Sequence, residues 1–186
     1  MNARISINLL NGDTYFYLEQ LSSNTYLHDF SCSITEYNDY LFNDALRSQQ
    51  DQIALTWLLM ERATGKIAAY MSLIADAVKL SLSEKETHSL NYPFKTIPAM
   101  KLAKLAVDKA AQEKFKGLGT YMITNALTIA RICNRQLFAC RFLTVDADLE
   151  HDKGVLAFYE KNGFITNGEL YNKNRKTISM RKDIFS

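Results

Sequence analysis

The chain has 186 residues, of which 47% are hydrophobic and 23% charged, and its formal net charge is +2 at pH 7. This length fits a single globular domain over residues 1–186 with a sizeable core, and this composition excludes a disordered chain. A net charge this small does not demand nucleic acid, for which clustered positive charge would be expected.

Cysteine usage, histidine spacing and the apolar runs exclude further classes of protein. The cysteines are Cys32, Cys133 and Cys140, an odd number without a CxxC pair. This pattern argues against a disulfide framework or a zinc site and indicates a reducing compartment. The three histidines lie too far apart in the sequence to suggest a metal cluster, and no apolar run approaches the roughly 20 residues of a membrane span. We therefore expect a soluble, cytoplasmic protein without a metal or a membrane partner.

The chain begins with a pattern typical of a β-hairpin. Apolar residues alternate over residues 5–9, which predicts a strand. Asn11 and Gly12 follow, and this pair favours a type I′ turn because both of its central residues need positive φ. Residues 15–18 are the expected return strand.

The first predicted helix begins at "SITE", residues 33–36. Ser33 and Glu36 have the spacing of a capping box, in which both side chains bond free amides at a helix start. Helical spacing then places Ile34, Tyr37, Leu41 and Ala45 on one face.

A second hairpin is expected in the middle of the chain. Two long apolar runs, residues 53–60 and 67–74, flank the turn sequence "ATGK" at residues 63–66. Trp57 lies in the first run and is expected in the core. The polar stretch 81–98 contains two prolines, and we interpret it as a long loop with one helical turn.

The second half of the chain alternates strands and helices. Strands are expected at 100–107, at 142–147 and around Ile178 and Met180, the last pairing with 168–171; helices are expected at 118–133 and 152–161. Asn162 and Gly163 are typical of a left-handed end of the second helix. This order predicts an α/β fold with a mixed sheet and helices on both faces.

Two glycines stand at the start of the helix predicted at 118–133. Gly117 and Gly119 follow Lys114 and Lys116 in "KFKGLG". Free amides and the helix dipole make such a helix start an anion site, and glycine lets a phosphate approach the backbone. The sequence is neither a P-loop nor a Rossmann fingerprint. A purely structural turn is the alternative interpretation.

A second motif, "LAFYEKNGF", covers residues 156–164. Phe158 and Tyr159 are adjacent, so they cannot both face the core from one helix. We expect Phe158 in the core and the Tyr159 hydroxyl toward the sheet opening. The alternative is that Tyr159 is an ordinary core or interface aromatic.

Together these stretches resemble the GNAT superfamily of N-acetyltransferases. Its coenzyme A motif, Gln/Arg-x-x-Gly-x-Gly/Ala, matches residues 114–119 with Lys114 in the first position. "KLAKLAVD" resembles the family's fourth strand, and "DKGVLAFYEKNGF" its Asn-x-x-Ala-x-x-Phe-Tyr signature, with Asp152 and Val155 in place of Asn and Ala. The resemblance implies a central, mostly antiparallel sheet that is splayed at the fourth and fifth core strands.

The resemblance also implies acetyl-coenzyme A as cosubstrate and an amine as acceptor. The pyrophosphate would lie on the amides of Lys116, Gly117, Leu118, Gly119 and Thr120. The pantetheine arm would pair with Leu105, Ala106 and Val107, where a bulge amide would face the oxyanion. Tyr159 would protonate the leaving thiolate. Lys114 and Lys116 would both add charge, and Asp152 stands where the family has a coenzyme A contact.

The general base stays open at this stage. Asp108 directly follows the predicted strand and is the obvious carboxylate, although a surface-turn aspartate is the favoured interpretation. Asp76, Asp146 and Asp148 lie at strand ends, where they would be solvated charges or reach the site. Asp152 has the alternative role of capping its helix. Cys133 lies on an apolar helix face and is expected in the core rather than as a nucleophile.

Three functions remain open for the acceptor side. Residues 30–50, "FSCSITEYNDYLFNDALRSQQ", resemble the early helix of a GNAT branch that includes tRNA-acetylating toxins, with Ser33 where that branch often has glycine. The acceptor would be a small, peptide or protein amine, or alternatively an aminoacyl-tRNA; a coenzyme A-binding protein without catalysis is the third possibility. A homodimer and an antitoxin partner also stay open. The lysines that could gather around tRNA are Lys95, Lys101, Lys104, Lys109, Lys114 and Lys116.

Overall fold

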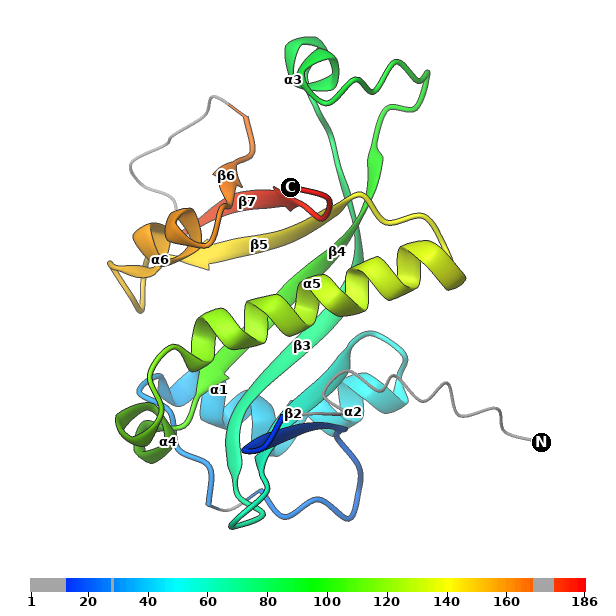
Figure 1. The fold of residues 1–186 in the computed structure, drawn as a ribbon. Coiled ribbons are helices and arrows are strands. Elements are labelled where there is room, and N and C mark those ends of the chain that lie inside the picture. The colour runs from blue at the N-terminus through cyan, green and yellow to red at the C-terminus, as the bar shows by residue number, and fades with distance from the viewer. Residues whose placement is uncertain (1–12, 28, 169–175) are drawn as a thin grey trace, which may run out of the picture. The chain divides into compact units, whose positions relative to one another are not determined.

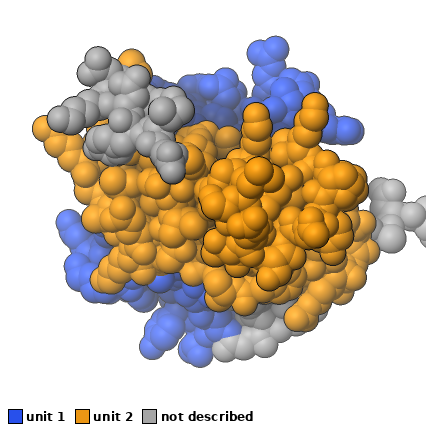
Figure 2. All heavy atoms as spheres, turned by 90° about the horizontal axis from the view of Figure 1, so that it is seen from above, with its two compact units in different colours: residues 1–72, 104–129 blue, residues 73–103, 130–186 orange. Residues whose placement is uncertain are grey.

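The computed structural model describes residues 13–27, 29–168 and 176–186 (Figure 1). The chain forms two compact units, which are coloured separately in Figure 2. Unit 1 contains residues 1–72 and 104–129, and unit 2 contains residues 73–103 and 130–186. The strand expected at residues 5–9 and the turn at Asn11 and Gly12 lie outside the described residues.

The described residues contain a seven-stranded sheet with the order β1-β2-β3-β4-β5-β7-β6. The strands are β1 (Phe16–Gln20), β2 (Leu55–Glu61), β3 (Ile67–Val78), β4 (Ile97–Val107), β5 (Phe142–Asp148), β6 (Ile165–Thr166) and β7 (Thr177–Asp183). The helices are α1 (Thr35–Asp39), the π-helix η1 (Tyr40–Asp44), α2 (Ala45–Gln50), α3 (Leu82–Thr87), α4 (Lys109–Lys114), α5 (Leu118–Gln136) and α6 (Val155–Lys161). The sheet is mostly antiparallel, with β4 and β5 as a parallel pair. The predicted mixed α/β fold is confirmed.

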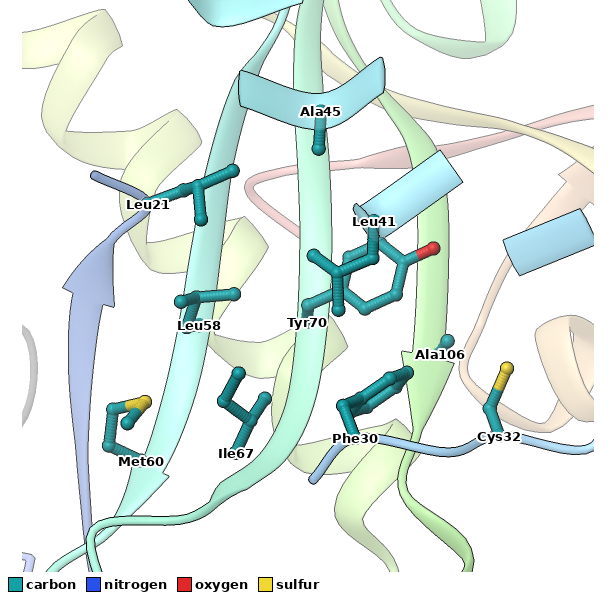
Figure 3. Close-up of a cluster of buried hydrophobic side chains, with 10 residues drawn as sticks. All are labelled: Leu21, Phe30, Cys32, Leu41, Ala45, Leu58, Met60, Ile67, Tyr70 and Ala106. Carbon is teal, nitrogen blue, oxygen red and sulfur yellow. The ribbon is translucent and has the colours of Figure 1, made fainter. Parts of the chain in front are cut away.

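The core of unit 1 lies between the α1–η1–α2 segment and strands β2, β3 and β4 (Figure 3). Leu41 and Ala45 are buried there, and Ile34 and Tyr37 pack against the same cluster, so the predicted helix face is confirmed. The hydroxyl of Tyr70 donates to the carbonyl oxygen of Tyr37 at 2.8 Å. This bond ties β3 to the first helix.

The capping box predicted at Ser33 and Glu36 is wrong. Helix α1 starts one residue later, with Ile34 as its N-cap and no side-chain cap bond. Asn38 explains the difference, because its Oδ1 accepts from the Cys32 amide at 2.8 Å and its Nδ2 donates to the Cys32 carbonyl oxygen at 3.2 Å. The chain before the helix is therefore held by Asn38 rather than by Ser33.

A complete capping box forms instead at α3, within the stretch predicted as a loop with one helical turn. Ser81 Oγ accepts from the Glu84 amide at 3.2 Å, and Glu84 Oε2 accepts from the Ser81 amide at 2.7 Å. Glu84 also contacts the guanidinium of Arg181 on β7 at 2.8 Å. The predicted helical turn is thus a six-residue helix fixed to the last strand of unit 2.

The central hairpin is confirmed, with β3 extending to Val78, beyond the predicted end at residue 74. The turn closes through Gly65, whose amide donates to the Glu61 carbonyl oxygen at 2.8 Å. Gly65 has a φ of 69°, a left-handed conformation that glycine adopts without strain. Trp57 of β2 is half-buried rather than part of the deep core.

Unit 2 is built on β5, β7 and β6. Strand β7 pairs antiparallel with β5 from Thr177 to Asp183 and with β6 at Met180 and Arg181. Most of the predicted partner segment 168–171 lies outside the described residues. Within the described part of the chain, no helix is long and apolar enough to cross a membrane.

Helix α6 begins at Val155, later than the predicted start at residue 152. Asp152 was considered as its N-cap, but the N-cap is Gly154. The Asp152 carboxylate instead accepts from the Gly154 amide at 2.7 Å, forming a turn before the helix. The helix ends at Asn162 and Gly163 as predicted, and Gly163 has a φ of 80°.

Candidate functional site

Strands β4 and β5 pair over only part of their length. Their parallel ladder runs from Ala99 with Phe142 to Leu102 with Val145, whereas β4 continues over residues 103–107 and β5 over 146–148. The predicted splay at these two strands is therefore confirmed. Leu105, Ala106 and Val107 lie beyond the end of the ladder with β5. These are the residues that the sequence assigned to the pantetheine arm.

Helix α4 follows β4 directly and was not predicted. Asp108 is its N-cap, with Oδ1 accepting from the Ala111 amide at 3.0 Å. Its other carboxylate oxygen accepts from the Ser31 amide at 2.9 Å, and the residue is only 8% exposed. The interpretation of Asp108 as a surface-turn residue is wrong. Because both carboxylate oxygens bind backbone amides, Asp108 joins α4 to the segment before α1 as a structural group.

The glycine loop lies between α4 and α5, at residues 115–117. Gly117 has a φ of 83°, and a Cβ added there would meet no other atom within 4 Å. Phe115 fixes the loop, because its ring packs edge-on to Phe16 with centroids 4.9 Å apart. Helix α5 then begins at Leu118, and the first amides of a helix have no acceptor within it. This arrangement suits an anion that approaches the loop backbone.

The two lysines before the glycines differ. Lys114 makes an ion pair with Glu61 at the end of β2, and its Nζ lies 4.8 Å from the centroid of the Phe115 ring. Its hydrogen bond to Glu61 holds the pKa of that carboxyl below its usual range, against the effect of burial. Lys116 is exposed. The positive charge of Lys114 is therefore already shared with a carboxylate.

Sequence reasoning missed one contact that fixes the start of α5. The Tyr121 hydroxyl donates to Asp13 Oδ2 at 2.5 Å, and Asp13 Oδ1 accepts from the amides of Tyr15 and Phe16 at 2.8 Å each. Burial and this bond raise the pKa of Tyr121, while the pKa of Asp13 is lowered because its hydrogen bonds outweigh its own burial. No local signal could reveal a pair 108 positions apart.

Tyr159 lies on α6 in unit 2. It is 8% exposed, whereas Phe158 is half-buried, so the expectation that Phe158 anchors the core is wrong. The Tyr159 ring packs on Phe164 with centroids 5.3 Å apart and on Phe158 at 5.2 Å. Phe164 follows the turn that ends the helix, and this turn brings its ring back against Tyr159.

The strand-end carboxylates of unit 2 are paired rather than simply solvated. The Thr144 hydroxyl donates to Asp76 Oδ2 at 2.5 Å, and Lys101 Nζ lies 2.9 Å from Asp146 Oδ2 and 3.7 Å from Asp76 Oδ2. We call these four residues the strand network. Beyond it, Asp148 lies 2.8 Å from His151 Nδ1.

The cysteines carry no sign of a reactive site. Cys32 and Cys140 are buried, while Cys133 is half-buried rather than fully in the core as predicted. Burial raises the pKa of all three thiols, to about 11 for Cys140. Among residues 13–27, 29–168 and 176–186, no group of three or more histidine, cysteine, aspartate or glutamate side chains could hold a metal ion.

Comparison with known proteins shows similarity at the level of structure. No protein-family model matches the chain, and no curated protein matches it by sequence. AtaT complexed with acetyl-methionyl-tRNAfMet is similar with a TM-score of 0.74 and 20% identity, covering 90% of this chain and 94% of AtaT. A KacT mutant has a TM-score of 0.71 and 19% identity, covering 90% and 95%. AtaT bound to acetyl-CoA and the C-terminus of the antitoxin AtaR has a TM-score of 0.69 and 19% identity, covering 91% and 94%.

Similarity at this level of identity shows a shared fold. The chain therefore shares the GNAT-like fold of AtaT and KacT, which is the fold that the resemblance in its sequence implied.

Proposed function

We propose that the chain is an acetyl-coenzyme A-dependent N-acetyltransferase. The observation that carries this proposal is the loop at Gly117, which opens the 19-residue helix α5 and is joined to the splayed strand β4 through the short helix α4. A splayed strand leaves backbone groups for an extended ligand, and a long helix start favours a phosphate. Acetyl-coenzyme A has both parts, a pyrophosphate and an extended pantetheine arm.

Residues of unit 1 would bind the cosubstrate. The pyrophosphate accepts from the amides of residues 116–120, and the pantetheine arm extends along Leu105, Ala106 and Val107. Lys116 contributes exposed positive charge, whereas Lys114 is held by Glu61 and contributes less. Asp152 bonds the Gly154 amide, so we do not assign it the contact that the family's asparagine makes.

Tyr159 would donate a proton to the leaving thiolate. The unprotonated amine nitrogen attacks the thioester carbonyl, the carbon–sulfur bond breaks, and the thiolate of coenzyme A takes the phenolic proton. The proton that the nitrogen loses passes to solvent, and solvent returns a proton to the Tyr159 phenolate. A backbone amide at the end of β4 stabilises the oxyanion during this step. A tyrosine this buried is held in one orientation by Phe164, and a fixed orientation favours proton transfer.

The acceptor that we propose is the α-amine of an aminoacyl-tRNA. The similarity to AtaT in its complex with acetyl-methionyl-tRNAfMet supports this choice, as does the resemblance of residues 30–50 to the toxin branch. An α-amine has an ordinary pKa of about 8, against about 10.4 for lysine, so more of it is unprotonated at neutral pH. Such an acceptor needs no strong general base, which fits an Asp108 that is occupied by amides.

An acetyl-transfer assay tests the proposal. The chain is incubated with labelled acetyl-coenzyme A and either methionyl-tRNA, uncharged tRNA, free methionine or a lysine peptide. We expect label on methionyl-tRNA that is released with the amino acid when the ester is hydrolysed. Label on the lysine peptide alone would replace the tRNA acceptor by a protein amine. Coenzyme A binding without any transfer would favour the non-catalytic alternative.

The proposed acceptor has two consequences for the setting of the protein. Aminoacyl-tRNA is consumed by translation, so the site of action would be the cytoplasm. The similarity to AtaT bound to AtaR supports a protein antitoxin as a partner. A single functional domain over residues 1–186 and a homodimer are further parts of this proposal.

A further inference from the structure

The strand network of Asp76, Lys101, Thr144 and Asp146 joins three neighbouring strands, and all four residues belong to unit 2. Asp76 comes from β3, Lys101 from β4, and Thr144 and Asp146 from one face of β5. Lys101 and Thr144 are register partners in the parallel ladder. Strand pairing, rather than a loop, therefore fixes the positions of these residues.

Asp146 holds a particular place in this network. It is the first residue of β5 after Val145, where the ladder with β4 ends. Its side chain is 44% exposed, compared with 23% for Lys101 and 24% for Asp76. A ligand entering from solvent at the splay of the strands would thus meet the Asp146 carboxylate before the two deeper groups.

The charges of the network do not balance. Two carboxylates share the single ammonium of Lys101, which lies 2.9 Å from Asp146 and 3.7 Å from Asp76. The Thr144 hydroxyl donates to Asp76 Oδ2 at 2.5 Å, but this uncharged donor neutralises no charge. One negative charge therefore remains without a counterion in the network. The cation that the network already binds, Lys101, is a primary ammonium. Both observations point to a cationic amine as a ligand.

We propose that Asp146 binds the protonated amine of the acceptor, displacing the Lys101 ammonium toward Asp76, and that the bound amine gives one proton to solvent before its nitrogen attacks the thioester. This inference rests on the acetyltransferase function proposed above and names the group that holds its acceptor. Lysine has a flexible four-carbon stem, so its ammonium can move while its backbone stays in the ladder. Asp76 keeps Lys101 paired after the exchange, and no charge is left alone. Asp146 is here a binding residue that sets the preference for cationic acceptors.

Binding of small probes tests the exchange without turnover. Methionine methyl ester carries the ammonium of an aminoacyl ester, and its desamino analogue has the same shape without the charge. In wild-type protein labelled with ¹⁵N at lysine side chains, we expect the ester, but not the analogue, to shift the Lys101 Nζ signal. No shift of this signal at saturating ester would overturn the proposal.

Three variants separate the acceptor site from a structural ion pair. Asp146→Asn should weaken ester binding about fivefold, the size of a partly exposed ion pair. Lys101→Met removes the competing cation and should tighten ester binding by a similar factor. Glu150→Gln is the matched control, because Glu150 pairs with Lys176 at 2.8 Å in the same unit, outside the network. Equal ester affinity in Asp146→Asn and wild type would identify the pair as structural.

Kinetics keep this inference distinct from the proposed function. In an active enzyme, Asp146→Asn should raise the KM for methionyl-tRNA about fivefold, with kcat and the KM for acetyl-coenzyme A unchanged. A wild-type protein that acetylates no acceptor contradicts the proposed function. If the wild type is active and Asp146→Asn has the same KM for methionyl-tRNA, only the role of Asp146 is contradicted.

Discussion

Replacing Asp108 separates a structural carboxylate from a catalytic base. In Asp108→Ala the α4 cap is lost, which costs about 1 kcal/mol. The Ser31 amide also loses its acceptor, and because that bond is only partly buried we take the lower end of the usual penalty, about 1 kcal/mol. The expected loss of about 2 kcal/mol corresponds to a fall in Tm of about 4–8 °C for a chain of this size.

Asp108→Asn refines this expectation, since its single amide oxygen can replace only one of the two carboxylate acceptors. We expect about half the loss of unfolding free energy seen in Asp108→Ala. Urea unfolding monitored by far-UV circular dichroism measures this loss. Asp152→Ala is the control, because Asp152 is exposed and bonds one local amide, so it should change stability by less than about 0.5 kcal/mol. The reasoning is refuted if Asp108→Asn keeps the wild-type Tm while kcat falls by about 10²-fold or more, the signature of a lost general base.

Three further predictions concern the cosubstrate, the proton donor and acid stability. Gly119→Val should place a branched side chain at the start of α5 and abolish coenzyme A binding in calorimetry, while circular dichroism shows a folded chain. Tyr159→Phe keeps the ring against Phe164 and should lower kcat roughly tenfold or more, about 1.4 kcal/mol, in single-turnover assays; full turnover would make Tyr159 a packing residue. Because the pKa of Asp13 is lowered from 3.8 in the folded chain, its stabilisation is present at neutral pH and lost as the pH falls below about 4. Tyr121→Phe should therefore flatten the decline in unfolding free energy between pH 5 and 3, and an unchanged slope would contradict this.

Local patterns predicted the elements whose signals are complete within a few residues. The turn at Gly65, the long helix α5 and the end of α6 at Gly163 need only periodicity and a residue that accepts positive φ. Helix α4 had a usable signal as well, since Asp108 stands before the good helix formers of "KAAQEK". An aspartate directly after a strand also fits a catalytic base, so its position alone does not distinguish capping from catalysis.

The two candidate capping boxes show why a local motif is not sufficient. "SITE" at residues 33–36 and "SLSE" at residues 81–84 have the same Ser-x-x-Glu spacing, yet only the second forms the reciprocal bonds. At the first, Asn38 binds both backbone groups of Cys32 and sets the helix start. The outcome depends on a competing side chain outside the motif, which the motif alone cannot reveal.

The charge distribution at the candidate site depends on contacts that the sequence does not show. The sequence assigned Lys114 and Lys116 the same role, because nothing in "KFKGLG" distinguishes them. The structure places the carboxylate of Glu61, from the end of β2, against Lys114 and leaves Lys116 exposed. A cation that already shares its charge gains less from a phosphate than an unshared one. Phosphate binding at this loop would therefore depend mainly on Lys116 and on the backbone amides that follow Gly117, so the conformation of the loop matters more than its number of lysines.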